Sequence, residues 1–343
     1  MELTKQNTTA IKGIAILCML WHHLFLNCTD YGHAIQFSGM ACKICVALFL
    51  FLSGYGMTIT YKKRVCAKTK PISKSGLINT IQFLLHRFKN FYLSYWPMMV
   101  GVILLGVACG YSLSQAYPNL NPWKRLLIDA AGYNGWQSYL NTWWFNKLII
   151  QIWLLFPFLY LLLSNRWLAM IGGAGLVVVE QFQLIPFFCF IEGGVFTFFV
   201  GMVAARYTLR ISRTPIYHIL AVLALVGLML CWHYVPQIAY TLLHAPIALL
   251  IVSLFAPPIS SQTKIGAAIR FLGGYSTEIY LCHTLFLIIC PSVVYALHFP
   301  LLDFAILLIM SLSMSMVVRL VSSKIGKTYD GIVIRIINRL NHA

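Results

Sequence analysis

Apolar runs long enough to cross a membrane recur along the chain, and they constrain its fold more than any other feature. A membrane-spanning helix needs about 20 mostly apolar residues. The chain of 343 residues is 60% hydrophobic and only 10% charged, whereas an ordinary soluble domain is about 25% charged. A soluble fold exposes much of its surface and has no place to bury so many apolar side chains. We therefore expect an all-α, polytopic membrane protein.

Ten segments reach the required length or come close to it, the fifth being the shortest. They lie near residues 11–28, 40–60, 90–110, 143–163, 166–181, 184–205, 216–233, 237–255, 277–297 and 301–321. We expect one integral membrane domain over residues 1–343, a bundle of about ten transmembrane helices. Apolar residues at helical spacing among Lys and Arg predict an amphipathic helix over 324–343, at the cytoplasmic surface.

The basic residues predict the orientation of these helices. The net charge of +17 suggests nucleic acid at first sight, but Lys and Arg stand in short clusters between apolar runs. With a cytoplasmic N-terminus, four of the 25 basic residues fall outside or near the outer interface, which leaves 21 inside. The four are Lys43, Lys124, Arg125 and Lys147. The positive-inside rule therefore predicts cytoplasmic N- and C-termini, a basic cytoplasmic connection over 61–89, and no nucleic-acid partner.

Ionisable side chains inside a membrane are costly, so each one in a predicted span is a candidate functional residue. Lys12 and His23 are 11 residues apart in the first span. Eleven residues make about three helical turns, so both lie on one face, with His23 roughly 16 Å deeper than Lys12, while His22 points about 100° away. From the residues alone, two interpretations stay open. One is a buried functional stripe; the other is a cytoplasmic anchor at Lys12 with histidines that only hydrogen-bond neighbouring helices.

Five short motifs follow one another along the chain. They are Lys12 and His23 with ten residues between them, Ser53-Gly54 after an aromatic stretch, His86-Arg87-Phe88-Lys89 ahead of Tyr95-Trp96, Trp143-Trp144-Phe145, and Leu272-Gly-Gly-Tyr running on to Tyr280 and His283. In this order they resemble the acyltransferase-3 family of integral membrane acyltransferases over nearly the whole chain. Two positions differ from the family's pattern. The family usually has Arg where this chain has Lys12, and Asn90 stands where a second Arg is common.

The resemblance implies acyl transfer, usually of acetyl, from a cytoplasmic acyl-CoA to a hydroxyl of a cell-surface or lipid-linked saccharide. His23 is expected to be the general base, because a neutral imidazole accepts a proton near neutral pH. Lys12, Arg87 and Lys89 lie at the predicted cytoplasmic edge, where cations suit the phosphates of coenzyme A. For Arg87 and Lys89, topology and lipid headgroups are the open alternative. Acyl-CoA is then a co-substrate, no cofactor is bound permanently, and the protein belongs in the cell membrane, of bacterial cytoplasmic type.

Weaker candidates for substrate contact are Tyr280, His283, Trp143 and Trp144. Tyr280 and His283 are three residues apart and share a helix face. A packed, hydrogen-bonded His283 is the alternative interpretation. Glu278 is expected to pair with a basic residue at the inner interface.

Glu192 lies well within the sixth predicted span, where a carboxylate needs a partner or a proton, and the sequence names no partner. Cys42 and Cys45 have the spacing of a redox or metal pair, but no second pair follows at zinc spacing. The chain also lacks a Gly-x-Ser-x-Gly motif. We therefore expect direct transfer with no metal.

The rival function is a membrane transporter or flippase that uses buried His and Glu as a proton relay. Internal repeats with broken helices would mark such a transporter, and the sequence shows no repeat. A non-catalytic scaffold would leave the stripe of Lys12 and His23 unexplained.

Overall fold

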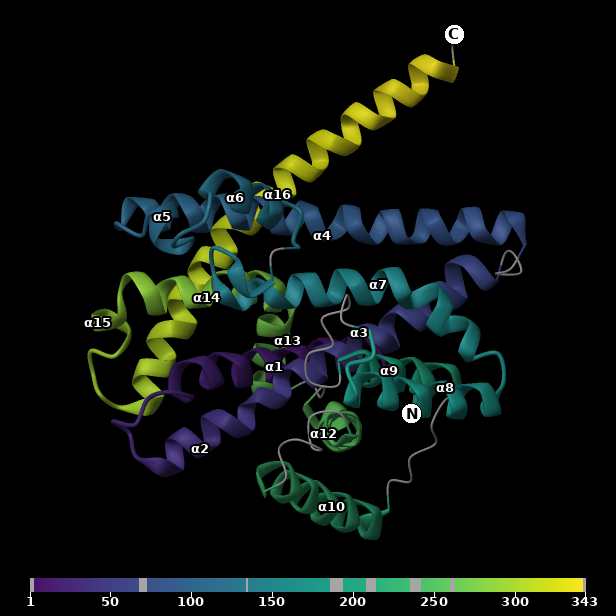
Figure 1. Ribbon diagram of the computed structural model, residues 1–343, viewed down its shortest axis with the longest axis horizontal. Coiled ribbons are helices and arrows are strands. Elements are labelled where there is room, and N and C mark those ends of the chain that lie inside the picture. Colours follow the sequence, from purple (N-terminus) through teal and green to yellow (C-terminus); the bar gives the residue numbers. More distant parts are fainter. Residues whose placement is uncertain are drawn as a thin grey trace. The chain divides into compact units, whose positions relative to one another are not determined.

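The computed structural model is all-helical over the residues that it describes, which are 3–67, 73–133, 135–185, 194–207, 214–234, 242–259 and 263–341. No strand occurs in these ranges, which confirms the all-α fold class. The α-helices labelled in Figure 1 are α1 (Lys5–Phe25), α2 (His33–Ala41), α3 (Cys45–Tyr61), α4 (Lys74–Ala108), α5 (Leu113–Ala116), α6 (Pro122–Ala130), α7 (Trp144–Leu162), α8 (Arg166–Gln181), α9 (Gly194–Tyr207), α10 (Pro215–Tyr234), α12 (His244–Ile259), α13 (Lys264–Gly274), α14 (Ser276–Ile289), α15 (Pro291–Val294) and α16 (Pro300–Asn341).

The membrane character of these helices follows from their length and composition. Five are long and apolar enough to cross a membrane: Lys5–Phe25, His33–Cys66, Lys74–Ala108, Asn141–Leu162 and Pro300–Lys324. A sixth is added if the bent pair Lys264–Gly274 and Ser276–Ile289 is one span. Shorter apolar helices are Gly194–Tyr207, Pro215–Cys231 and His244–Ala256. Each of the ten predicted segments contains a described helix, and the count of about ten spans stays a prediction.

Two helices run beyond their predicted ends. α4 begins at Lys74, so much of the 61–89 segment is helical rather than a plain connection. Its 35 residues at 1.5 Å each make about 52 Å, well over the roughly 30 Å of a bilayer's hydrocarbon core, so α4 must extend out of that core. α16 continues unbroken from Pro300 to Asn341, so the predicted tail helix continues the last predicted span. The side chains that would make this tail amphipathic lie outside the described residues.

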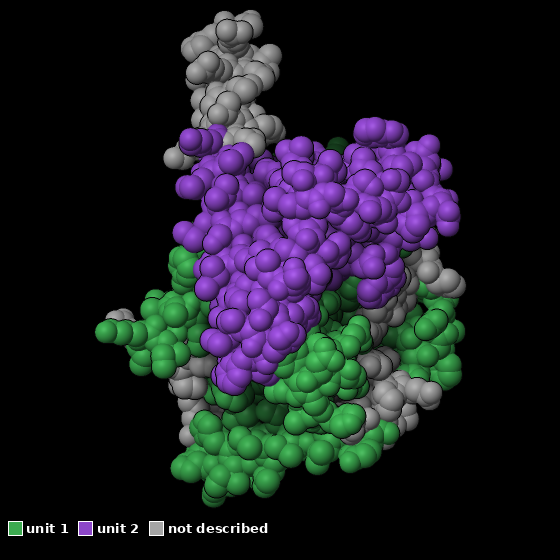
Figure 2. Space-filling model, turned by 90° about the vertical axis from the view of Figure 1, so that its left-hand side faces the viewer, with its two compact units in different colours: residues 1–84, 144–276 green, residues 85–143, 277–343 purple. Residues whose placement is uncertain are grey.

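The helices form two compact units, each built from two stretches of chain, and Figure 2 colours them separately. Unit 1 comprises Met1–Leu84 and Trp144–Ser276, and unit 2 comprises Leu85–Trp143 and Thr277–Ala343. α4 therefore contributes residues to both. Each unit has its own packing.

Glycines allow the close approach of α3 and α9, the two helices with the most extensive contact in unit 1. A Cβ atom at Gly54 would collide with the carbonyl oxygen of Phe198. In the reverse direction, a Cβ at Gly201 would collide with the carbonyl oxygen of Phe51. The two backbones thus touch where each helix lacks a side chain, as small residues allow between helices in membranes. Gly54 belongs to the Ser-Gly motif of the sequence, and its role in this structure is packing.

Unit 2 is organised around the buried carboxylate of Asp129, at the end of α6. Its Oδ2 accepts hydrogen bonds from the Tyr117 hydroxyl at 2.5 Å and from the Tyr139 backbone N–H at 2.7 Å. The Tyr95 hydroxyl of α4 donates to the Asp129 carbonyl oxygen at 2.6 Å. Burial and the nearby Asp129 carboxylate raise the pKa of Tyr117, and burial followed by Tyr111 raises that of Tyr139 to about 12. The phenols therefore stay protonated and serve as donors, which fixes the fold of the 111–142 segment.

Candidate active site

The helix that carries Lys12 and His23 is continuous, as predicted. α1 begins after the N-cap Thr4, whose side chain accepts a hydrogen bond from the Asn7 backbone at 3.1 Å, and it runs to Phe25 without a break. Lys12 is exposed and His23 is half-buried. Because the helix is regular between them, the two side chains share one face about 16 Å apart along the axis.

His22 is held in unit 1 by the neighbouring helix α2. The ring is buried, and its Nδ1 lies 2.8 Å from the carbonyl oxygen of Gly39. A carbonyl only accepts hydrogen bonds, so Nδ1 of His22 must carry the proton. Trp21 makes a second bond to α2, from Nε1 to the hydroxyl of Ser38 at 2.8 Å. The rings of His22 and His23 meet edge to face at 5.0 Å between centroids, so His22 packs beside the candidate base and points toward α2.

A second attachment fixes α1 near Lys12, and sequence reasoning missed it. A Cβ at Gly13 would collide with the carbonyl oxygen of Ile269 in α13, and a Cβ at Gly273 would collide with that of Thr9. The backbones of α1 and α13 are therefore in direct contact on both sides of Lys12. Gly273 belongs to the glycine pair of the fifth motif, so that motif has a packing role in unit 1.

Arg87 and Lys89 lie on α4, in unit 2, and both are half-buried. Two helical residues span about 200°, so these cations leave nearly opposite sides of the helix. A ligand that engages both must contact them with separate groups. Their assignment to the donor stays a prediction.

Unit 2 brings three of the predicted substrate contacts together. Trp143 donates from Nε1 to the carbonyl oxygen of Leu281 at 2.9 Å, and Tyr280 donates from its hydroxyl to the carbonyl oxygen of Thr142 at 2.7 Å. His283 is fully buried, with Nδ1 at 2.9 Å from the Tyr280 carbonyl oxygen of its own helix. The polar groups of Trp143 and Tyr280 thus join the end of the 111–142 segment to α14. These residues position that segment, and their contact with substrate stays a prediction.

The remaining candidates have simpler surroundings. Trp144 begins α7 in unit 1 and is half-buried, with its ring 5.9 Å from that of Phe145. Cys42 and Cys45 carry free thiols. Glu192 lies outside the described residues. Within the described ranges, no three His, Cys, Asp or Glu side chains are grouped to hold a metal ion.

The expected ion pair of Glu278 is present, and its partner is Arg319 of α16. The guanidinium makes two hydrogen bonds, Nε to Oε1 at 3.0 Å and Nη2 to Oε2 at 2.5 Å. Glu278 is 8% exposed and Arg319 is 34% exposed. A buried carboxylate is costly without a charged partner. Arg319 is that partner, and the ion pair joins α14 to α16 within unit 2.

A family model described as an acyltransferase domain matches residues 8–320, nearly the whole chain. No curated protein and no solved structure matches the chain. The matched range includes α1 with its lysine and histidine, the α13–α14 glycine motif and the candidate spans between them. The chain therefore belongs to the acyltransferase-3 family and is a membrane acyltransferase.

Proposed function

We propose that this acyltransferase moves an acetyl group from a cytoplasmic acyl-CoA to a hydroxyl of a cell-surface or lipid-linked saccharide, with His23 as general base. The observation that carries the proposal is the unbroken helix α1. It holds Lys12 at an exposed position and His23, half-buried, three turns further along the same face. Such a stripe links a cation at one side of the membrane to a proton acceptor deeper inside it.

In the proposed reaction, His23 accepts the proton of the acceptor hydroxyl as its oxygen attacks the thioester carbonyl. A tetrahedral intermediate forms and collapses, the carbon–sulfur bond breaks, and the acetyl ester is left on the saccharide. The coenzyme A thiolate leaves and takes up a proton, for which the protonated His23 is the nearest source on α1. General-base catalysis of this kind contributes about 10²–10⁴-fold to the rate.

The donor is proposed to bind through Lys12, Arg87 and Lys89. Coenzyme A carries a diphosphate and a separate ribose phosphate, so it presents more than one anionic group. This suits cations that leave opposite sides of α4, each meeting a different phosphate. Arg contacts phosphate with a planar fork, whereas Lys acts as a compact charge.

The saccharide is proposed to approach the 111–142 segment. Trp123 and Trp136 are 69% and 55% exposed there, and indole faces suit the apolar faces of sugar rings. Exposed Trp also occurs at membrane interfaces, which is the alternative role of these two side chains.

The orientation of the chain is part of the proposal. The split of 21 basic residues inside against four outside supports cytoplasmic termini. In a chain whose native cysteines are replaced, a cysteine at Lys63 should react only with membrane-permeant thiol reagents added to whole cells. A cysteine at Lys124 should also react with an impermeant reagent. The reverse pattern, or equal labelling of both, would remove the proposed orientation.

The test of the base compares His23→Ala with His22→Ala at matched abundance in the membrane. Transfer is measured as O-acetyl signals in the NMR spectrum of surface polysaccharide from cells that lack the protein and carry each variant. His23→Ala should abolish the signals. His22→Ala should keep substantial activity, because the His22 ring is hydrogen-bonded to the Gly39 carbonyl oxygen. If His22→Ala is inactive and His23→Ala is active, the base is His22. If both variants are active, the base does not lie on α1.

A further inference from the structure

Unit 1 contains a groove between α8 and α9 that the proposed reaction does not use. The two helices are antiparallel: the Glu180 carboxylate at the end of α8 accepts a hydrogen bond from the Val195 N–H at the start of α9, at 2.6 Å. At the other end, the Tyr207 hydroxyl of α9 donates to the carbonyl oxygen of Leu163, just before α8, at 3.1 Å. Both ends are fixed, and the groove between them encloses about 690 Å³.

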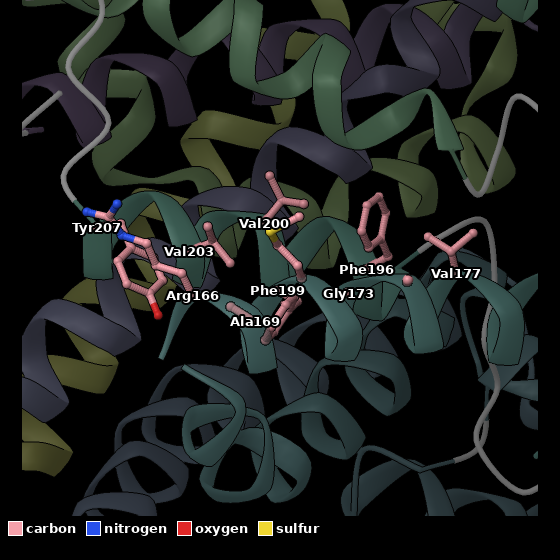
Figure 3. Close-up of a pocket in the computed structure, with 11 residues that line it drawn as sticks. Arg166, Ala169, Gly173, Val177, Phe196, Phe199, Val200, Val203 and Tyr207 are labelled. Atoms are coloured by element: carbon pink, nitrogen blue, oxygen red, sulfur yellow. The ribbon is translucent and has the colours of Figure 1, made fainter. Parts of the chain in front are cut away.

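The wall of this groove is apolar along almost its whole length. Small residues of α8 leave space for the groove, and larger side chains of α9 form the opposite wall. These residues are Ala169, Gly173 and Ala174 on α8, and Phe196, Val200 and Val203 on α9. Figure 3 shows Ala169, Phe196, Val200 and Val203 along the space between the two helices. The lining runs from Arg166 to Val177, which at 1.5 Å per residue is about 16 Å. Half of a bilayer's hydrocarbon core is about 15 Å thick, so the groove has the length of one leaflet.

Positive charge is concentrated at one end. Arg166 and Tyr207 lie together there, opposite Val177 (Figure 3). Arg166 is exposed, and the described residues give its guanidinium no ion pair or hydrogen bond. Arg206 is close to the same end, since its Nε lies 3.5 Å from the Leu163 carbonyl oxygen. Arg166 is also the first residue of α8, so the positive end of the helix dipole adds to the charge.

We propose that this groove binds a phospholipid of the inner leaflet, with one acyl chain along α8 and α9 and the anionic phosphate at Arg166. The charge at the mouth complements a phosphate, and the apolar wall complements an acyl chain of leaflet length. Both arginines belong to the basic residues predicted on the cytoplasmic side, which selects the inner leaflet. The inference does not depend on the acetyl transfer proposed above, because no residue of the groove takes part in it.

The test uses the full chain in mixed micelles with equal amounts of phosphatidylglycerol and phosphatidylcholine, and native mass spectrometry to count retained lipids. The chain should retain phosphatidylglycerol in preference to phosphatidylcholine. Arg166→Ala should lower that preference about tenfold, whereas Lys62→Ala, which removes another exposed cation of unit 1, should not change it. Val200→Trp should fill the groove and lower retention of both lipids. Ile171→Trp, on the exposed face of α8 away from the groove, should leave retention unchanged.

Several results would overturn the proposal. They are equal retention of the two lipids by the unmodified chain, an unchanged preference in Arg166→Ala, or the same loss in Ile171→Trp as in Val200→Trp. Arg166 is exposed, so its replacement is a test that does not depend on repacking the groove. A parallel sample contains palmitoyl-CoA as competitor. If it displaces phosphatidylglycerol in an Arg166-dependent manner at lower concentration than a soluble phosphatidylglycerol does, the occupant is an acyl-CoA and the phospholipid is excluded.

Discussion

Two adjacent glycines of α13 should respond in opposite ways to the same substitution. A Cβ at Gly273 would collide with the carbonyl oxygen of Thr9 and lie 2.8 Å from the backbone nitrogen of Gly13, whereas a Cβ at Gly274 has nothing within 4 Å. Overpacking typically costs about 1–3 kcal/mol. At Gly273 the obstacles are backbone atoms of α1, which cannot rotate away, so we expect the upper end, about 3 kcal/mol.

Gly274→Ala should be neutral or stabilising by up to about 1 kcal/mol, because alanine favours a helix over glycine. The two variants therefore differ by about 3–4 kcal/mol, which is more than a hundredfold in the unfolding equilibrium constant. Denaturation in dodecylmaltoside–SDS mixtures, followed by circular dichroism, measures that difference. Gly273→Ala should also reduce acyl transfer, since α13 must move away from the helix that carries Lys12. Equal stability of the two variants would refute the direct backbone contact of α1 with α13.

Three further predictions concern single groups. Glu278→Gln and Arg319→Met should each lower the unfolding free energy by about 2 kcal/mol. This loss is smaller than that for breaking a fully buried ion pair, because Arg319 is 34% exposed. In a double-mutant cycle, the double variant should lose less free energy than the sum of the two single losses. Asp129→Asn should loosen the 111–142 segment, measured as faster proteolysis there, because the bonds from a tyrosine hydroxyl and a backbone N–H lose their charged acceptor. Arg87→Ala and Lys89→Ala should raise the KM for acyl-CoA more than that for the acceptor; an unchanged KM for acyl-CoA in both would remove them from the donor site.

Local periodicity was enough to predict α1 and the relative placement of its polar residues. The helix needs only its own backbone bonds, and 3.6 residues per turn determine which side chains share a face. The same reasoning underestimated α4, because the residues after Lys74 are too polar for a hydrophobic window although they continue the helix. Hydropathy detects the part of a helix that lipid surrounds, and it does not detect the part that extends beyond the membrane.

Contacts between distant residues were only partly predictable. The cost of burying Glu278 predicted a basic partner, but Arg319 is 41 residues away and nothing in the sequence singles it out. The carboxylate of Asp129 was missed altogether, since its partners are a tyrosine hydroxyl and a backbone N–H, and neither has a sequence signature. A buried charge indicates that a partner is needed, but which residue is the partner depends on how the helices pack.

The attachments of α1 give a physical reason for the position of the candidate base. A catalytic side chain must be held within about 0.5 Å of its productive position, and this requires a rigid element with supporting contacts. α1 has such contacts at three levels: the cap at Thr4 at its start, the approach of Gly13 to α13 in its middle, and the bond of His22 to Gly39 at its end. Rotation of the helix by one residue, about 100°, would turn His22 into the direction that His23 now faces and break both later contacts. The neighbours of α1 therefore determine which of the two adjacent histidines faces the stripe of Lys12, and Gly13→Ala, which disturbs the contact with α13, should reduce transfer without altering His23 itself.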